Sequence, residues 1–67
     1  MSEDMPLLLS RAQSDFREMP GLIITAKQAA RLWGIDRAVS DRLLTRLVDS
    51  GFLRRTAAGA FTRGNQP

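Results

Sequence analysis

The chain has 67 residues, of which 43% are hydrophobic, and a formal net charge of +3. Its length allows one domain with a small core, and the sequence contains no cysteine for disulfides or thiolate metal sites. Histidine and tyrosine are absent as well, which removes the commonest general base, so we expect no catalysis, no metal and no cofactor. No apolar run approaches the roughly 20 residues that span a bilayer. We therefore expect a cytoplasmic protein with no membrane contact and no small-molecule substrate.

The charge is distributed unevenly along the chain. Residues 1–26 carry two arginines against four acids, a net charge of −2, whereas residues 27–67 carry one lysine and seven arginines against three aspartates, a net charge of +5. Arginine pairs bidentately with phosphates and with guanine edges. The basic segment favours a nucleic-acid partner, but small domains with no such partner also carry mixed basic surfaces.

The first expected element is an amphipathic helix. Residues 1–5 show no pattern and are expected to form a flexible terminus. Pro6 suits the first turn of a helix, where its missing N–H costs nothing. Apolar residues then recur at three- and four-residue spacing: Leu8, Leu9, Ala12, Phe16 and Met19. The sequence Met19-Pro20-Gly21 should end this helix, and residues 22–24 are long enough only for a brief strand or an apolar connector.

Capping residues predict two further helices. Thr25 is a candidate N-cap with Gln28 three residues later, which makes a capping box, and Gly34 should end this second helix. Its apolar face would carry Ala26, Ala29, Ala30 and Trp33. Asp36 is the candidate N-cap of a longer helix that should run to Ser50.

The helix expected over residues 36–50 has one apolar arc and one polar arc. The apolar arc holds Leu43, Leu44, Leu47 and Val48, with Val39 at one edge. Ser40 lies near the middle of this arc, and its hydroxyl is expected to donate to the carbonyl of Asp36 in the preceding turn. The polar arc holds Ala38, Asp41, Arg42, Thr45, Arg46 and Asp49.

The remaining residues predict a β-hairpin. Its strands should cover residues 52–55 and 60–63, with Gly59 available for a positive φ in the loop between them. Residues 64–67 are expected to form a loose tail. Side chains alternate between the faces of a strand, so Arg54 and Arg55 cannot both face one partner.

This order of elements predicts a mainly α domain over residues 6–63 with a small β-hairpin. Six residues have a spacing that carries a family resemblance: Ala30, Gly34, Ser40, Leu43, Leu47 and Gly51. Together with the stretch GFLRRTAAGAFTR at residues 51–63, this spacing resembles the winged helix-turn-helix domains of bacterial regulators of the MarR type. The resemblance covers roughly residues 22–63. It implies three helices plus a two- or three-stranded wing.

The resemblance also implies a function, namely binding of double-stranded DNA in transcription regulation. The helix over residues 36–50 would enter the major groove, with the hairpin over residues 52–63 as the wing beside it. Residues expected to contact DNA are Lys27, Arg31, Arg37, Arg42, Thr45, Arg46, Arg54, Arg55 and Arg63. Within the wing, we expect Arg63 and one of the pair Arg54 and Arg55 to contact DNA.

Asp41 departs from this pattern, because phosphates repel a carboxylate unless it pairs with Arg37 or Thr45 or accepts from a cytosine amine. An alternative function is therefore a winged-helix module that binds a protein, through exposed apolar groups such as Val39. A homodimer could form through Met5 and Leu7, although these residues could equally cover the core of a monomer. RNA is disfavoured, because the four aromatic side chains are needed for the core.

Overall fold

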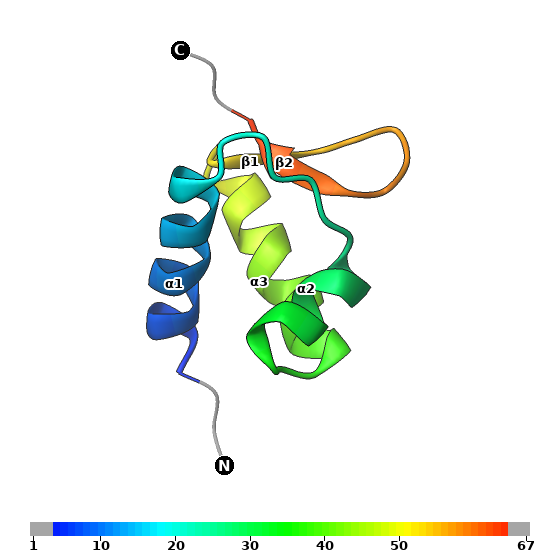
Figure 1. The fold of residues 1–67 in the computed structure, drawn as a ribbon. Coiled ribbons are helices and arrows are strands. Elements are labelled where there is room, and N and C mark those ends of the chain that lie inside the picture. The colour runs from blue at the N-terminus through cyan, green and yellow to red at the C-terminus, as the bar shows by residue number, and fades with distance from the viewer. Residues whose placement is uncertain (1–3, 65–67) are drawn as a thin grey trace.

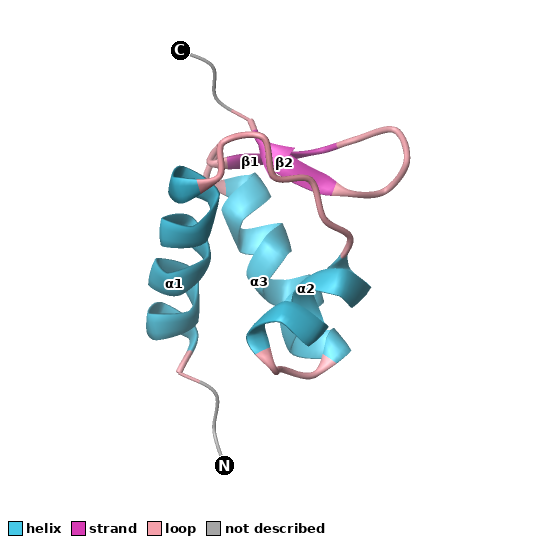
Figure 2. Cartoon of the chain, in the orientation of Figure 1, coloured by secondary structure: helices cyan, strands magenta, loops and turns pink. Residues whose placement is uncertain are grey.

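The computed structural model describes residues 4–64 and is mainly helical, as the sequence predicts. The elements are α1 (Met5–Glu18), α2 (Ala26–Trp33), α3 (Arg37–Asp49), β1 (Leu53–Arg55) and β2 (Phe61–Arg63). Helices α1 and α3 run beside each other, α2 packs on α3, and the hairpin closes one end of the bundle (Figure 1). The two strands form one antiparallel sheet (Figure 2). Three helices followed by a hairpin are therefore confirmed.

Helix α1 begins at Met5, one residue before the expected start, with proline in its first turn. Ala12 and Phe16 are its buried residues. Met19 had been expected to continue the apolar stripe, but it caps the helix and is 47% exposed. The flexible ends were expected over residues 1–5 and 64–67; residues 1–3 and 65–67 lie outside the described residues, whereas Asp4 is the N-cap of α1 and Met5 is its first residue. Gly64, the first residue of the expected tail, donates its N–H to the Phe52 carbonyl at 3.0 Å.

Helix α2 begins and ends at the residues that the sequence predicts. The Gln28 N–H donates to the Thr25 hydroxyl at 3.1 Å, and the Thr25 N–H donates to the Gln28 side chain at 2.9 Å. This reciprocal capping box satisfies two N–H groups that helix formation leaves without partners. Gly34 ends the helix with φ of 66°, a left-handed conformation that disfavours side chains with a Cβ atom.

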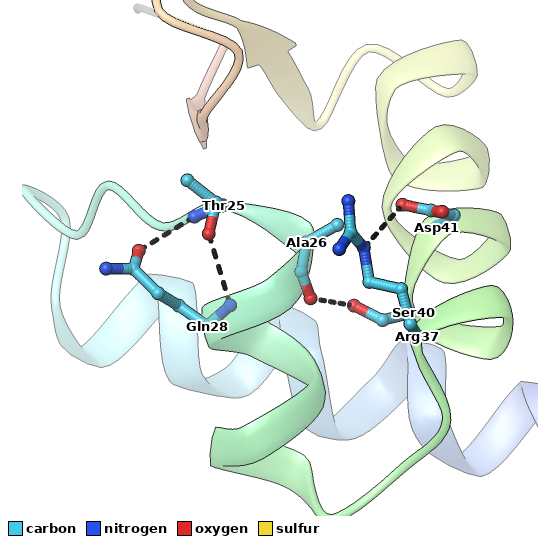
Figure 3. A network of polar contacts seen from close by, with 6 residues as sticks. All are labelled: Thr25, Ala26, Gln28, Arg37, Ser40 and Asp41. Atoms are coloured by element: carbon cyan, nitrogen blue, oxygen red, sulfur yellow. Dashed lines mark hydrogen bonds and ion pairs between the residues drawn. The ribbon is translucent and has the colours of Figure 1, made fainter.

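The environment of Ser40 differs from the expected one. Its hydroxyl does not donate to Asp36; it donates to the Ala26 carbonyl in the first turn of α2, at 2.8 Å (Figure 3). Asp36 is the N-cap of α3 as predicted, but its side chain makes no capping hydrogen bond. Ser40 is fully buried, and the bond satisfies its hydroxyl while tying α3 to α2.

Val39 also differs from its expected place. It was expected at the edge of the apolar arc and as an exposed group for a protein partner, but only 3% of its surface is exposed. A residue at the edge of a helical arc is buried whenever a neighbouring element covers that edge. Val39 is therefore part of the interior and cannot provide a docking surface.

Replacing Ser40 tests the connection between α2 and α3. We expect Ser40→Ala to lower the free energy of unfolding by about 1 kcal/mol, because the net value of one hydrogen bond is of that order. Chemical denaturation followed by Trp33 fluorescence measures this loss. Ser14→Ala, at an exposed position of α1, is the matched control and should leave the midpoint unchanged. Equal midpoints for Ser40→Ala and the wild type would contradict the assignment.

The hairpin has a three-residue ladder in which Leu53 pairs with Arg63, Arg54 with Thr62, and Arg55 with Phe61. Ile24 adds an isolated antiparallel bridge to Phe61, so the connector before α2 touches the outer edge of β2. Gly59 has φ of 85°, as its place in the loop predicts. The bridge joins the connector before α2 to strand β2, and in this way it orients the hairpin on the helices.

The core lies where the three helices and the hairpin meet. Phe16 is its centre: its ring makes edge contacts with Trp33 and Phe52, each at 6.4 Å between centroids. The indole N–H of Trp33 donates to the Asp15 carboxylate at 2.7 Å. Leu43, Leu44 and Leu47 fill the side of α3 that faces this cluster. The core therefore holds α3 by one face and leaves the opposite face to solvent.

Candidate nucleic-acid interface

The exposed face of α3 carries three of the residues expected to contact DNA. Arg42, Thr45 and Arg46 are exposed, and together with Asp41 they line a shallow hollow on the surface of the helix. Arg46 also borders a second hollow that faces α1, lined in part by Leu9 and Gln13. The structure thus brings Arg42, Thr45 and Arg46 together, with Arg46 at the edge nearest α1.

Arg37 and Asp41 lie on the same side of α3, one turn apart. The Nε of Arg37 is 3.6 Å from the Oδ1 of Asp41, and the two side chains are 61% and 55% exposed (Figure 3). Arg37 therefore points outward, although its helical angle directs it toward the core side. The Asp41 carboxylate is paired with Arg37, which is one of the two pairings that the sequence left open.

Helix α2 adds two exposed cations, Lys27 and Arg31, which lie one turn apart on the same face. The bond between the Ser40 hydroxyl and the Ala26 carbonyl holds the first turn of α2 against the first turn of α3. Lys27 directly follows Ala26, and Arg37 lies in the first turn of α3. The starts of the two helices thus bring basic residues from both to one region of the surface.

The three arginines of the hairpin have different surroundings. Residues paired across an antiparallel ladder share a face, so Arg55 and Arg63 lie on the face of the buried Leu53 and Phe61, and Arg54 lies on the other. The Arg55 guanidinium lies over the Phe61 ring, 5.2 Å from its centroid. Arg54 and Arg55 are both exposed, and within residues 4–64 Arg54 makes no such ring contact.

Arg63 is half-buried and lies over the Phe52 ring at 4.6 Å, where Arg17 of α1 also lies at 5.6 Å. The Nε atom of Arg63 is buried and has no hydrogen-bond partner among residues 4–64. Two guanidinium groups therefore share one ring at the base of the hairpin, away from the loop at residues 56–60. Stacking of this kind stabilises the docking of the hairpin on α1. Arg17 was not among the predicted site residues, and no local pattern in the sequence indicates its contact with Phe52.

Neither a metal centre nor a membrane span is evident in the part of the chain that the structure describes. Residues 4–64 contain no group of three acidic, histidine or cysteine side chains that could hold a metal ion. No helix within these residues is long and apolar enough to cross a bilayer.

Comparison of the chain with protein-family models, with curated proteins and with solved structures found no match. The function of this chain is therefore inferred from its own residues.

Proposed function

We propose that the chain is a winged helix-turn-helix domain that binds double-stranded DNA and regulates transcription. In this proposal α3 enters the major groove, α2 lies across the phosphate backbone, and the hairpin is the wing. Binding is sequence-specific or semi-specific, and the domain performs no catalysis. A protein with this function resides in the cytoplasm with bacterial DNA.

The observation that carries the proposal is the two-sided character of α3. One side is buried in the core through Leu43, Leu44 and Leu47, and the other presents Arg42, Thr45 and Arg46 to solvent. A helix with its side chains is about 10–12 Å across, which fits the roughly 12 Å width of the major groove. A helix held rigidly by its inner face loses little conformational entropy when its outer face binds.

The phosphate contacts in this proposal come from Arg42 and Arg46 on α3 and from the exposed cations beside that helix. Lys27 and Arg31 on α2 and Arg54 on the hairpin are exposed, and cations of this kind fix the register of a protein on the duplex without reading its sequence. Arg55 and Arg63 have their guanidinium groups on aromatic rings. We assign these two to holding the hairpin in place, since leaving the rings would weaken its packing.

An NMR titration with a duplex of about one helical turn (~10 base pairs) tests the proposed face. Amide shifts should change on the outer side of α3, in the first turn of α2 and at Arg54. The exposed serines of α1, Ser10 and Ser14, should keep their shifts and serve as the internal control. Changes centred on α1, or none at low salt, would contradict the proposal.

A second candidate function is protein binding, and the observation that favours it lies on α1. Leu7 is 66% exposed and lines a shallow groove with Leu8 and Ile35. Helix-turn-helix domains commonly bind two half-sites on DNA as a dimer. The partner to test is therefore a second copy of the chain.

We expect Leu7→Ser to reduce the dimer fraction in sedimentation velocity and to leave the affinity for a duplex of one helical turn unchanged. Arg42→Ala should do the reverse, weakening binding to that duplex without changing the dimer fraction. A wild-type protein that stays monomeric at all concentrations would rule out this use of the groove.

A further inference from the structure

A carboxylate beside a guanidinium changes which ligand the guanidinium prefers. Arg37 and Asp41 are both more than half exposed and form an ion pair at 3.6 Å, so their combined charge is zero. A DNA phosphate approaching this pair meets repulsion from Asp41 together with attraction to Arg37. A base edge carries no net charge and is therefore repelled less strongly by Asp41. The pair is therefore better matched to a base than to a phosphate.

The ion pair between Arg37 and Asp41 uses the Nε atom of Arg37 and leaves the terminal nitrogens of its guanidinium available to a base. Asp41 faces the Nε edge of the guanidinium, and the two terminal nitrogens of Arg37 lie beyond that edge (Figure 3). Guanine presents two acceptors, O6 and N7, to the major groove, and the arginine fork binds them bidentately. Contact with Asp41 restricts a side chain that otherwise has many rotamers, which lowers the cost of ordering it on DNA.

The second carboxylate oxygen of Asp41 adds a possible contact. The ion pair uses Oδ1, and a carboxylate oxygen can accept from the N4 amine of cytosine. Arg37 and Asp41 are four residues apart, about 6 Å along the helix axis. Base pairs rise about 3.4 Å each. The separation of the two residues along the helix thus corresponds to nearly two base-pair steps.

We propose that Arg37 reads a guanine in the major groove and that Asp41 is the positioning residue that directs Arg37 to it. This inference rests on the proposed function, because it requires α3 to lie in the groove. It assigns Arg37 to sequence reading, in contrast to the cations that contact phosphates. The site that the protein selects then contains a guanine at one fixed position.

Selection from a pool of random duplexes, followed by sequencing of the bound fraction, tests the inference. The wild type should enrich guanine at one position by roughly fivefold to a hundredfold, the discrimination of one bidentate contact. Arg37→Lys keeps the positive charge but cannot bind guanine bidentately. Asp41→Asn keeps the shape of the side chain but removes the carboxylate that positions Arg37. Both variants should therefore lose this enrichment. Asp41→Asn should also bind random duplexes at least as tightly as the wild type, since a negative charge is gone.

Two control variants make the test specific. Asp49→Asn removes the same charge from an exposed position in the last turn of α3, and Arg11→Lys makes the same exchange on α1. Both should keep the guanine enrichment. Wild-type binding without a guanine preference, or a preference that survives in Arg37→Lys and Asp41→Asn, overturns the inference and leaves the proposed function standing. Absence of wild-type binding to any duplex at low salt overturns both.

Discussion

Phe16→Ala is expected to destabilise the protein severely and to move its denaturation midpoint far below that of the wild type. Phe16 is fully buried and its ring contacts both Trp33 and Phe52. Truncating a buried phenylalanine costs about 3–5 kcal/mol, through lost burial and the cavity that remains. A domain of 67 residues has a total stability of only about 3–10 kcal/mol. One substitution thus removes a large share of the total.

Urea denaturation followed by far-ultraviolet circular dichroism measures this loss. Phe16→Leu is the matched control, because it keeps an apolar side chain at the same place and should cost less than the truncation. If Phe16→Ala unfolded at the wild-type midpoint, Phe16 could not be the centre of the core.

Replacing Arg42 and Arg46 together by alanine is expected to cause the largest loss of DNA binding. Both are exposed on the outer face of α3, one turn apart, so their removal should leave the core intact. Each phosphate contact contributes about 0.9 to the slope of log affinity against log salt. At 0.1 M salt, losing two such contacts weakens binding roughly sixtyfold.

Fluorescence anisotropy with a labelled random duplex measures the affinity of the double variant. Arg11→Glu on α1 removes the same two units of positive charge at an exposed position elsewhere on the surface, and it is the control for net charge. Equal losses in the two variants would mean that binding follows net charge, without a defined face. A loss confined to the α3 variant supports the groove-facing assignment.

Features governed by neighbouring residues in the chain could be predicted from the sequence. The capping box of Thr25 and Gln28 links residues three apart, and Gly34 and Gly59 take the left-handed conformations expected at a helix end and a hairpin loop. The helix order, the hairpin and the outward face of α3 follow from such local patterns and from apolar spacing. The exposed positions of Arg42, Thr45 and Arg46 followed from helical angles alone.

Features governed by contacts between distant segments could not be predicted. The acceptor of the Ser40 hydroxyl belongs to α2, fourteen residues away, so a local hydrogen bond was the wrong expectation. Val39 is buried because of how the helices pack, which its place on a helical arc does not determine. Helical angle placed Arg37 toward the core, but its long side chain reaches outward to Asp41. The stacking of Arg17 and Arg63 on Phe52 joins α1, the start of the hairpin and its end, and no spacing rule connects these residues.

We propose that the basic face formed by α3 and its neighbours binds duplex DNA. The most direct test of this proposal is an anisotropy titration of the wild-type protein with a random duplex across a series of salt concentrations. We predict that log affinity falls linearly with log salt, by about 0.9 for each phosphate neutralised, with several phosphates in contact. Absence of binding at low salt, or an affinity that does not change with salt, would contradict the claim.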